Sequence, residues 1–139
     1  MASANALALT KKIADAYFTG SWKMLLVSSV PSESDLDTFA FRSSIANEVA
    51  ASGTYVSGGA SVTCSVGAVD TTNNRVAVTF GNPAAFTGAT ISAAGAWIYK
   101  SIGSAATDEL AHFIDFGSVV SSTNSTYTVT ITTPLYINR

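Results

Sequence analysis

Apolar positions in the N-terminal part of the chain repeat with the period of a helix. Spacings of three and four residues place Ala6, Leu9, Ile13, Ala16 and Tyr17 in one apolar stripe. This spacing predicts a helix over residues 4–18, and a glycine two residues later favours its end at that point.

The segment after this helix has a less regular pattern. A continuous apolar run predicts a buried strand over residues 22–30, and the polar, acidic stretch 31–37 predicts a loop. Beyond the loop, apolar residues spaced by four predict a second, short helix within residues 39–51. The members of this second stripe are Phe41, Ile45 and Val49.

From residue 61 onward, apolar and polar residues alternate, which is the period of a half-buried strand. Alternation over residues 61–68 and 76–80, with a tight polar connection at 70–74, predicts a β-hairpin. Further strands are expected over residues 89–100, 109–116 and 127–132, separated by a loop at 103–107 and a Ser/Thr-rich connection at 117–124.

The order of these elements predicts the fold class. About six strands follow the helical segment without helical crossovers between them, so neighbouring strands must be mainly antiparallel. We therefore expect a mainly β (α+β) fold, with an N-terminal helix followed by an antiparallel β-sandwich or open barrel. Residues 1–139 are expected to form a single domain: a helical N-terminal segment (1–20), a β-rich body (21–133) and a C-terminal tail (134–139).

Composition narrows the classes of function. Charged residues make up only 12% of the 139 residues and hydrophobic residues 47%, and the mean hydropathy is +0.33. A chain with so few charges is expected to cover part of its surface with a partner, which predicts an oligomer or an assembly subunit. The alternative is a monomer with a neutral surface of Ser and Thr side chains, because exposed apolar atoms are common on any protein. The net charge of −2 and the absence of a basic cluster disfavour nucleic-acid binding. No apolar run is long enough to cross a membrane.

The residues capable of chemistry are few and scattered. In a strand, His112 and Asp115 point to opposite faces, so they cannot act as a catalytic pair. Cys64 falls on the apolar face of its strand, which is typical of a buried small hydrophobe. The carboxylates at 33, 35 and 37 could hold calcium, but without the EF-hand spacing we expect a solvated loop. The sequence therefore predicts no catalytic residue, no cofactor and no metal site.

Three stretches occur in an order and spacing that resemble a known family. The first runs from Phe41-Arg42-Ser43-Ser44 through Asn47-Glu48-Val49 to Tyr55 and Gly58-Gly59. The second is Ala89-Thr90-Ile91-Ser92-Ala93 leading into Trp97-Ile98-Tyr99-Lys100. The third is Leu110-Ala111 with Ile114-Asp115-Phe116-Gly117, then a Ser-rich turn and Tyr127-Thr128-Val129. Together they resemble small virion structural proteins of tailed bacteriophages, which are encoded among head and tail genes.

The resemblance implies a virion component made in the cytoplasm of the host bacterium. Its natural role is a decoration or cement protein on the capsid exterior, and such proteins are often trimeric. The implied partners are further copies of the chain and the major capsid protein or another virion protein. The chain ends, Met1 to Ala4 and Pro134 to Arg139, are expected to act as arms that order on a neighbour. The expected partner interface consists of Trp22, Trp97, Tyr99, Leu135, Tyr136 and Ile137.

Other readings stay open. Trp97 and Tyr99 share one face of their strand, where core packing is the default alternative to contact with a partner. Within the virion, the chain could instead belong to the tail, the neck or a fibre anchor. An adhesin-like β-module that binds glycans would use Trp22, Trp97 and the five tyrosines as stacking platforms. An enzyme is disfavoured by the single His and the missing motifs.

Overall fold

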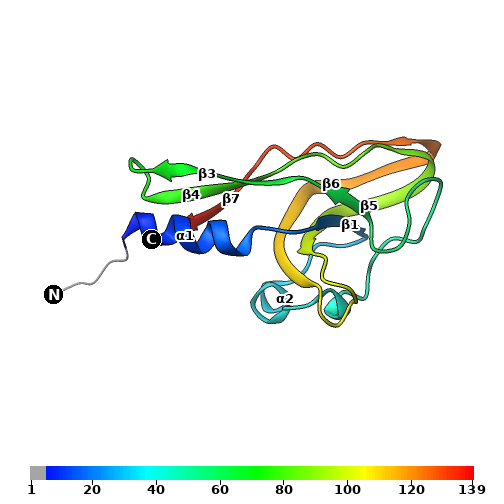
Figure 1. Cartoon of the computed structure of the whole chain (residues 1–139). Coiled ribbons are helices and arrows are strands. Elements are labelled where there is room, and N and C mark those ends of the chain that lie inside the picture. Colours follow the sequence, from blue (N-terminus) through cyan, green and yellow to red (C-terminus); the bar gives the residue numbers. More distant parts are fainter. Residues whose placement is uncertain (1–5) are drawn as a thin grey trace. The chain divides into compact units, whose positions relative to one another are not determined.

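Two antiparallel sheets and an N-terminal helix form most of the regular structure of residues 6–139, the part of the chain that the computed structural model describes (Figure 1). The predicted fold class, mainly β with an N-terminal helix and antiparallel strands, is confirmed. The described residues divide into two compact units. Unit 1 comprises the residues up to Gly20, Thr63–Gly81 and Ile131–Arg139, and unit 2 comprises Ser21–Val62 and Asn82–Thr130.

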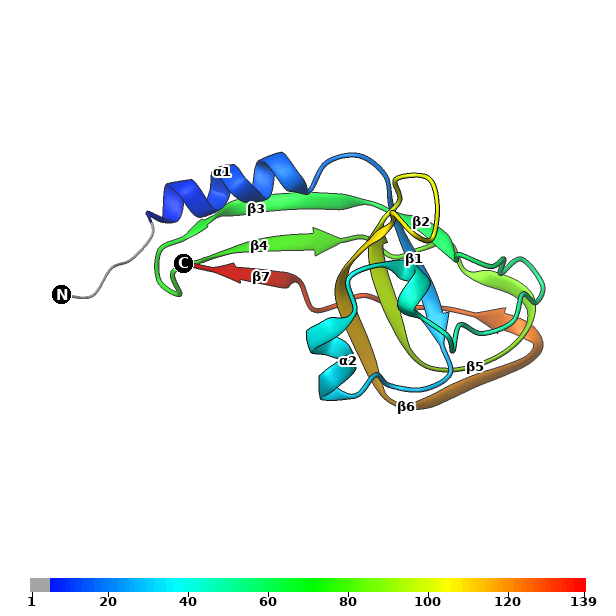
Figure 2. The same cartoon turned by 90° about the horizontal axis from the view of Figure 1, so that it is seen from below.

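Unit 1 is one helix packed against a small sheet. The helix α1 (Leu7–Tyr17) lies beside the sheet with strand order β3-β4-β7, as Figure 2 shows. The strands are β3 (Cys64–Asp70), β4 (Arg75–Phe80) and β7 (Leu135–Asn138). Alternate residues of β4 are buried, in keeping with its period-two pattern. The predicted hairpin is confirmed, because β3 and β4 are paired antiparallel.

The tight connection of this hairpin is explained by its polar residues. The Asp70 carboxylate accepts hydrogen bonds from the backbone amides of Thr72 and Asn73 and from the Asn73 side chain. These bonds hold the pKa of Asp70 below its ordinary value, with the Asn73 side chain the largest cause. Asn74 has a φ of 55°, a conformation that asparagine tolerates better than most residues.

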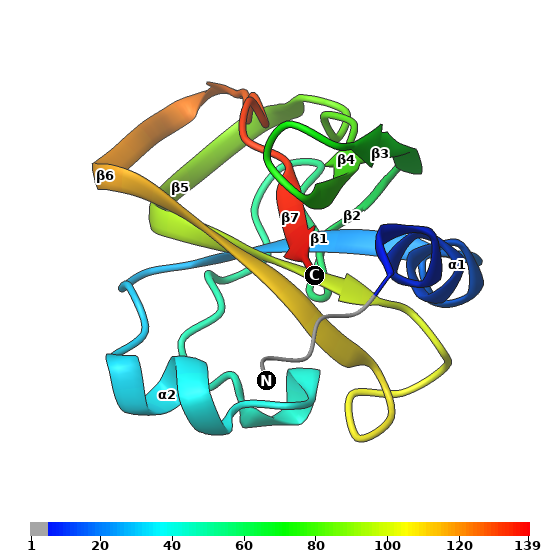
Figure 3. The ribbon, with the colours of Figure 1, turned by 90° about the vertical axis from the view of Figure 1, so that its left-hand side faces the viewer.

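Unit 2 is built on a four-stranded sheet with the order β2-β1-β5-β6. Its strands are β1 (Trp22–Val27), β2 (Ala60–Val62), β5 (Phe86–Lys100) and β6 (Glu109–Tyr127). β5 and β6 run side by side as one long ribbon (Figure 3). The central strands β1 and β5 supply the buried cluster of Leu25, Val27, Trp97 and Tyr99. β1 is buried on both faces, as its apolar run predicts.

The helix predicted within residues 39–51 is wrong, and so is the loop at 31–37. The helix of this region is α2 (Glu33–Thr38), which is followed by a 3₁₀ turn at Arg42–Ser44. α2 forms because Ser32 and Asp35 make a capping box: the Asp35 amide donates to the Ser32 hydroxyl, and the Ser32 amide donates to the Asp35 carboxylate. Residues 47–49 instead run along β1, where the Val49 amide donates to the Leu26 carbonyl.

The C-terminal third also differs from its prediction. β6 continues through residues 117–124, which were expected to connect two strands, and residues 128–134 form no strand. β6 stays paired with β5 because bulges absorb the irregular stretches, one of them at Gly117, whose φ is 76°. The predicted tail, 134–139, contains β7, which pairs antiparallel with β4. The expectation that this segment is an arm is therefore corrected.

The N-terminal helix is shorter than predicted and shows an unexpected orientation. α1 begins at Leu7, and the expected arm Met1 to Ala4 lies outside the described residues. Thr10 and Ala14 are its buried positions, whereas Leu9 and Ile13 of the predicted apolar stripe are exposed. Most of the stripe therefore lies at the surface of the described chain, and only Tyr17 of its members is half-buried.

Candidate functional site

The aromatic residues expected at a partner interface are buried. Trp22, Trp97 and Tyr99 are almost inaccessible, because they lie on the central strands β1 and β5. The Trp97 ring packs against Phe113 with 5.1 Å between ring centroids. The expectation that these three residues form a partner surface is therefore wrong, and core packing is the correct alternative. A glycan-binding module would also lose Trp22 and Trp97 as exposed stacking platforms.

The three other expected interface residues lie on β7. Leu135 and Ile137 stand opposite Val78 and Val76 of β4, so they share the sheet face of these buried valines and are themselves half-buried. Tyr136 lies on the other face and is exposed, with the Arg75 guanidinium carbon 3.6 Å from the centre of its ring. Their role in contact with a partner remains a prediction.

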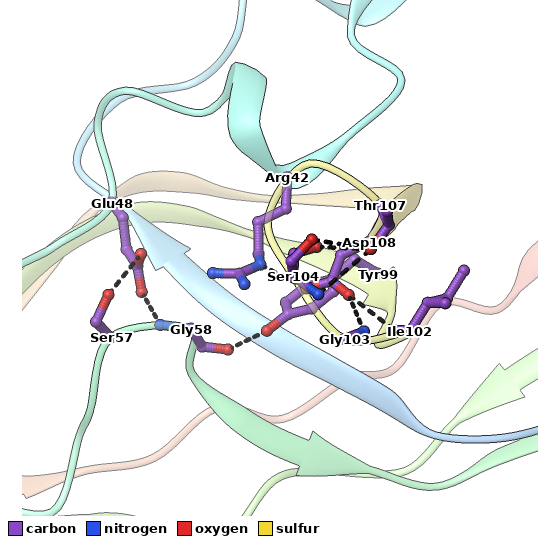
Figure 4. A network of polar contacts seen from close by, with 10 residues as sticks. All are labelled: Arg42, Glu48, Ser57, Gly58, Tyr99, Ile102, Gly103, Ser104, Thr107 and Asp108. Carbon is purple, nitrogen blue, oxygen red and sulfur yellow. Dashed lines mark hydrogen bonds and ion pairs between the residues drawn. The ribbon is translucent and has the colours of Figure 1, made fainter.

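The most connected polar site of unit 2 is centred on Asp108 (Figure 4). Its carboxylate is only 3% exposed and accepts hydrogen bonds from the backbone amides of Ile102, at 2.7 Å, and Gly103, at 3.1 Å. Arg42 Nε donates to the second carboxylate oxygen at 2.9 Å. Burial alone raises the pKa of Asp108, but these hydrogen bonds outweigh burial and hold the pKa below its ordinary value.

A second part of the same site joins Arg42 to Glu48 through Tyr99 and Gly58. The Arg42 guanidinium carbon lies 5.2 Å from the centre of the Tyr99 ring, and the Tyr99 hydroxyl donates to the Gly58 carbonyl at 2.5 Å. The Gly58 amide donates to Glu48 Oε1 at 2.6 Å. Burial raises the pKa of Tyr99 to about 12, so this hydroxyl keeps its proton at any physiological pH.

Tyr55 completes the network beside Glu48. Its hydroxyl donates to Glu48 Oε1 at 3.0 Å and accepts from the Leu26 amide of β1 at 3.0 Å. Burial raises the pKa of Tyr55 well above its ordinary value. Among the described residues, every buried side-chain nitrogen or oxygen has a hydrogen-bond partner. The network thus joins the loops at 42–58 and 101–108 to the sheet, which is a structural task.

Sequence reasoning did not find this network, although a signal was present. Arg42 and Asp108 are 66 positions apart, and no local pattern reports such a contact. Five members of the network occur within the stretches that carry the bacteriophage resemblance: Arg42, Glu48, Tyr55, Gly58 and Tyr99. In the structure the first two of these stretches meet at one place, where their residues hold the loops of unit 2 to its sheet.

A small groove in unit 2 is the other candidate for binding. Its volume is about 260 Å³, and it lies between the segment after β1, α2 and the residues after the 3₁₀ turn, with Trp97 in its lining. This volume falls below the range of about 300–1,000 Å³ that is typical of ligand pockets. The Asn47 amide group at its rim is already engaged, because it donates to the Ser29 carbonyl and hydroxyl.

The remaining candidate residues are not brought together. His112 is half-buried on β6 in unit 2, and burial lowers its pKa. Cys64 is half-buried in unit 1, with its sulfur 3.9 Å from the Phe18 carbonyl oxygen. Within residues 6–139, no three His, Cys, Asp or Glu side chains are grouped so that they could hold a metal ion. No helix in the same range is long and apolar enough to cross a membrane.

Exposed apolar residues occur on β6 as well as on α1. Val119 is 58% exposed and Val120 is 44% exposed, both in the half of the β5–β6 ribbon that is distant from Glu109. No charged residue lies between Arg75 and Lys100 or between Asp115 and Arg139, so this part of the ribbon is free of charge.

Comparison with known proteins identified no relative of this chain. No protein-family model, no curated protein and no solved structure matches the chain.

Proposed function

We propose that this chain is a bacteriophage virion structural protein, and specifically a capsid decoration or cement protein. In this role it binds the head shell from outside as a homo-oligomer, with a trimer favoured, and it stabilises the shell against rupture. It is made in the cytoplasm of the host bacterium, and it acts by adhesion, without a catalytic step or a cofactor. The support comes from the three stretches of resemblance and from the properties of the exposed surface.

The observation that carries the proposal is the uncharged distal half of the β5–β6 ribbon, with Val119 and Val120 exposed on it. The interior of a protein interface is poor in charged residues, because a buried charge loses its hydration. A surface of hydroxyl and apolar side chains avoids this cost. Burial of such a surface against a neighbour stabilises both partners by removing apolar area from water.

The polar network supports the same task by holding the loops of unit 2 to its sheet. Asp108, Arg42 and Tyr99 attach two long loops to the central strand β5, whose far end lies in the uncharged ribbon. A surface that is already ordered loses little conformational entropy on binding. Many copies on one shell would then act together, so a modest affinity for each copy is sufficient.

The test is binding of the purified chain to phage heads that lack it. We expect saturable binding of many copies per head and a higher temperature of head rupture, measured by sedimentation and by release of packaged DNA. Purified tails serve as the second arm of the experiment. Binding to tails alone would place the chain in the tail, neck or fibre anchor. Absence of binding to both particles would refute a virion role.

A further inference from the structure

The small groove of unit 2 that is lined in part by Trp97 (the Trp97 groove) combines an apolar lining with polar residues. Its apolar part consists of Trp97, Phe39, Pro31, Val30 and Ala46. Phe39 packs against the buried cluster that contains Trp97, so the two aromatic side chains belong to one cluster. The volume of about 260 Å³ is too small for a drug-sized ligand. A groove of this size suits one inserted side chain, which is how anchor residues bind in protein interfaces.

The polar residues of this lining carry oxygen atoms that the described chain leaves without a partner. Asp35 uses Oδ2 to accept from the Ser32 amide, whereas its Oδ1 bonds to none of the described residues. Asn47 uses its NH₂ group on Ser29, so the side-chain atom that stays open within residues 6–139 is the acceptor Oδ1. Carboxylate and amide oxygens can only accept hydrogen bonds. A side chain that satisfies both of them must therefore be a donor.

Charge around the groove favours a cationic donor. Residues 29–48 contain one cation, Arg42, and four carboxylates: Glu33, Asp35, Asp37 and Glu48. Arg42 donates to Asp108, so this cation is already used by the polar network. Asp35 is the carboxylate of the groove lining, and it forms no ion pair with any residue that the structure describes. A cation in the groove would supply Asp35 with an opposite charge, so the charge there is complementary to a basic side chain.

We propose that the Trp97 groove binds an arginine side chain of a partner protein. The guanidinium group has several N–H donors for Asp35 and Asn47, and its plane and aliphatic stem can pack against Phe39 and Trp97. Arginine fits better than lysine, because an ammonium group is more strongly hydrated and has no flat surface. This inference deepens the proposed function, and it rests on that function only for the source of the arginine, a neighbouring virion protein.

The test uses the purified chain without phage particles, so a failure here is distinct from a failure to bind heads. The probe is N-acetyl-arginine amide, and N-acetyl-citrulline amide is its matched control, because a neutral urea group replaces the guanidinium. Proton–nitrogen NMR spectra of the labelled chain follow the titration. We expect saturable shifts at the Trp97 indole and at residues 44–47, with a dissociation constant on the order of 1 mM for so small a ligand.

The controls separate charge and shape. The citrulline derivative and N-acetyl-lysine amide should each bind at least about fivefold more weakly than the arginine derivative. Added salt should weaken binding of the arginine derivative and leave binding of the citrulline derivative unchanged. The absence of shifts, shifts that map outside the groove, or equal binding of the arginine and citrulline derivatives would overturn the inference. Equal binding of the lysine derivative would overturn the assignment to arginine.

Asp35→Asn provides the decisive variant. Asparagine keeps the size of the side chain and an oxygen that can accept from the Ser32 amide, so α2 keeps its cap. Asp37→Asn is the matched control, because it removes the same charge from the same helix at a position outside the groove lining. We expect Asp35→Asn to weaken binding of the arginine derivative at least about fivefold and Asp37→Asn by less than about twofold. Equal effects of the two substitutions would contradict the proposed contact with Asp35.

Discussion

Substitution of Asp108 by Asn tests whether the polar network holds unit 2 together. The change keeps the size of the side chain and one oxygen that can accept from the Ile102 and Gly103 amides. It removes the negative charge, and it can place an NH₂ group against the Arg42 Nε–H, which is also a donor. Arg42 then loses its carboxylate partner at a position where the Asp108 side chain is almost inaccessible to water.

The size of the effect follows from the burial of the pair. Removal of one partner from a fully buried ion pair costs about 3–5 kcal/mol. The Asp108 side chain is 3% exposed, but the Arg42 side chain is 23% exposed and can recover part of its hydration. We therefore expect Asp108→Asn to lower the free energy of unfolding by about 2–3 kcal/mol. The control is Asp15→Asn on α1, which breaks an exposed pair with Lys11 and should cost no more than about 0.5 kcal/mol.

The assay is urea unfolding followed by tryptophan fluorescence. Both tryptophans, Trp22 and Trp97, are in unit 2 and buried, so their emission reports on the unit that contains Asp108. The midpoint should fall while the dependence on urea concentration stays unchanged. If Asp108→Asn shifts the midpoint no more than Asp15→Asn does, the network does not stabilise unit 2 and our reasoning is wrong.

The dependence on pH provides a second check with a defined sign. The pKa of Asp108 is lower in the folded chain than its ordinary value, so the folded form binds this proton less readily than the unfolded chain does. Its stabilising contribution is therefore complete above the unfolded pKa of about 4 and is lost as the pH falls through the folded pKa. The stability of the wild type should approach that of Asp108→Asn as acid is added. A constant difference across this range would contradict the assignment.

Three further predictions follow from local geometry. Gly59→Ala should destabilise unit 2 by about 2 kcal/mol or more in the same unfolding assay, because the φ of Gly59 is 75° and a Cβ would overlap the Met24 carbonyl. Ser32→Ala should cost about 1 kcal/mol through loss of the α2 cap, with faster hydrogen exchange at Asp35 as its signature. Deletion of residues 134–139 should speed exchange along β4, whereas Tyr136→Phe should not; unchanged exchange after deletion would contradict the pairing of β7 with β4.

Local pattern was sufficient where two strands adjacent in sequence pair with each other and where a continuous apolar run is buried on both faces. The β3–β4 hairpin and the burial of β1 followed from periodicity and turn residues alone. Pattern failed where a distant contact decides the conformation. Ile45 and Val49 have helical spacing, yet Val49 is held along β1 by the Leu26 carbonyl. The Ser-rich segment after Gly117 has the composition of a loop between two strands, but pairing with β5 keeps it in a strand.

In the candidate site, too, local features could be predicted from the sequence and contacts between distant segments could not. That Trp97 and Tyr99 share a strand face was correctly read from the sequence, but which face of a two-sided sheet is covered depends on segments elsewhere in the chain. Tyr99 is covered by residues near Gly58, to which its hydroxyl donates. Asp108 and Arg42 carried no signal as a pair, because an ion pair between distant loops leaves no periodic trace.

Charge placement connects the composition of the chain with its proposed mode of action. If the few charged residues were spread evenly over the surface, their small number would only make the protein less soluble. Here the charged residues are absent from two long stretches that become neighbours as β5 and β6, so pairing of these strands concentrates the uncharged surface at one place. Two of the serine hydroxyls there, Ser121 and Ser92, are bonded to each other, and Val119 and Val120 are exposed apolar residues of the same strand. The shortage of charge in the sequence is thereby concentrated in one part of unit 2, which is where the proposed function requires it.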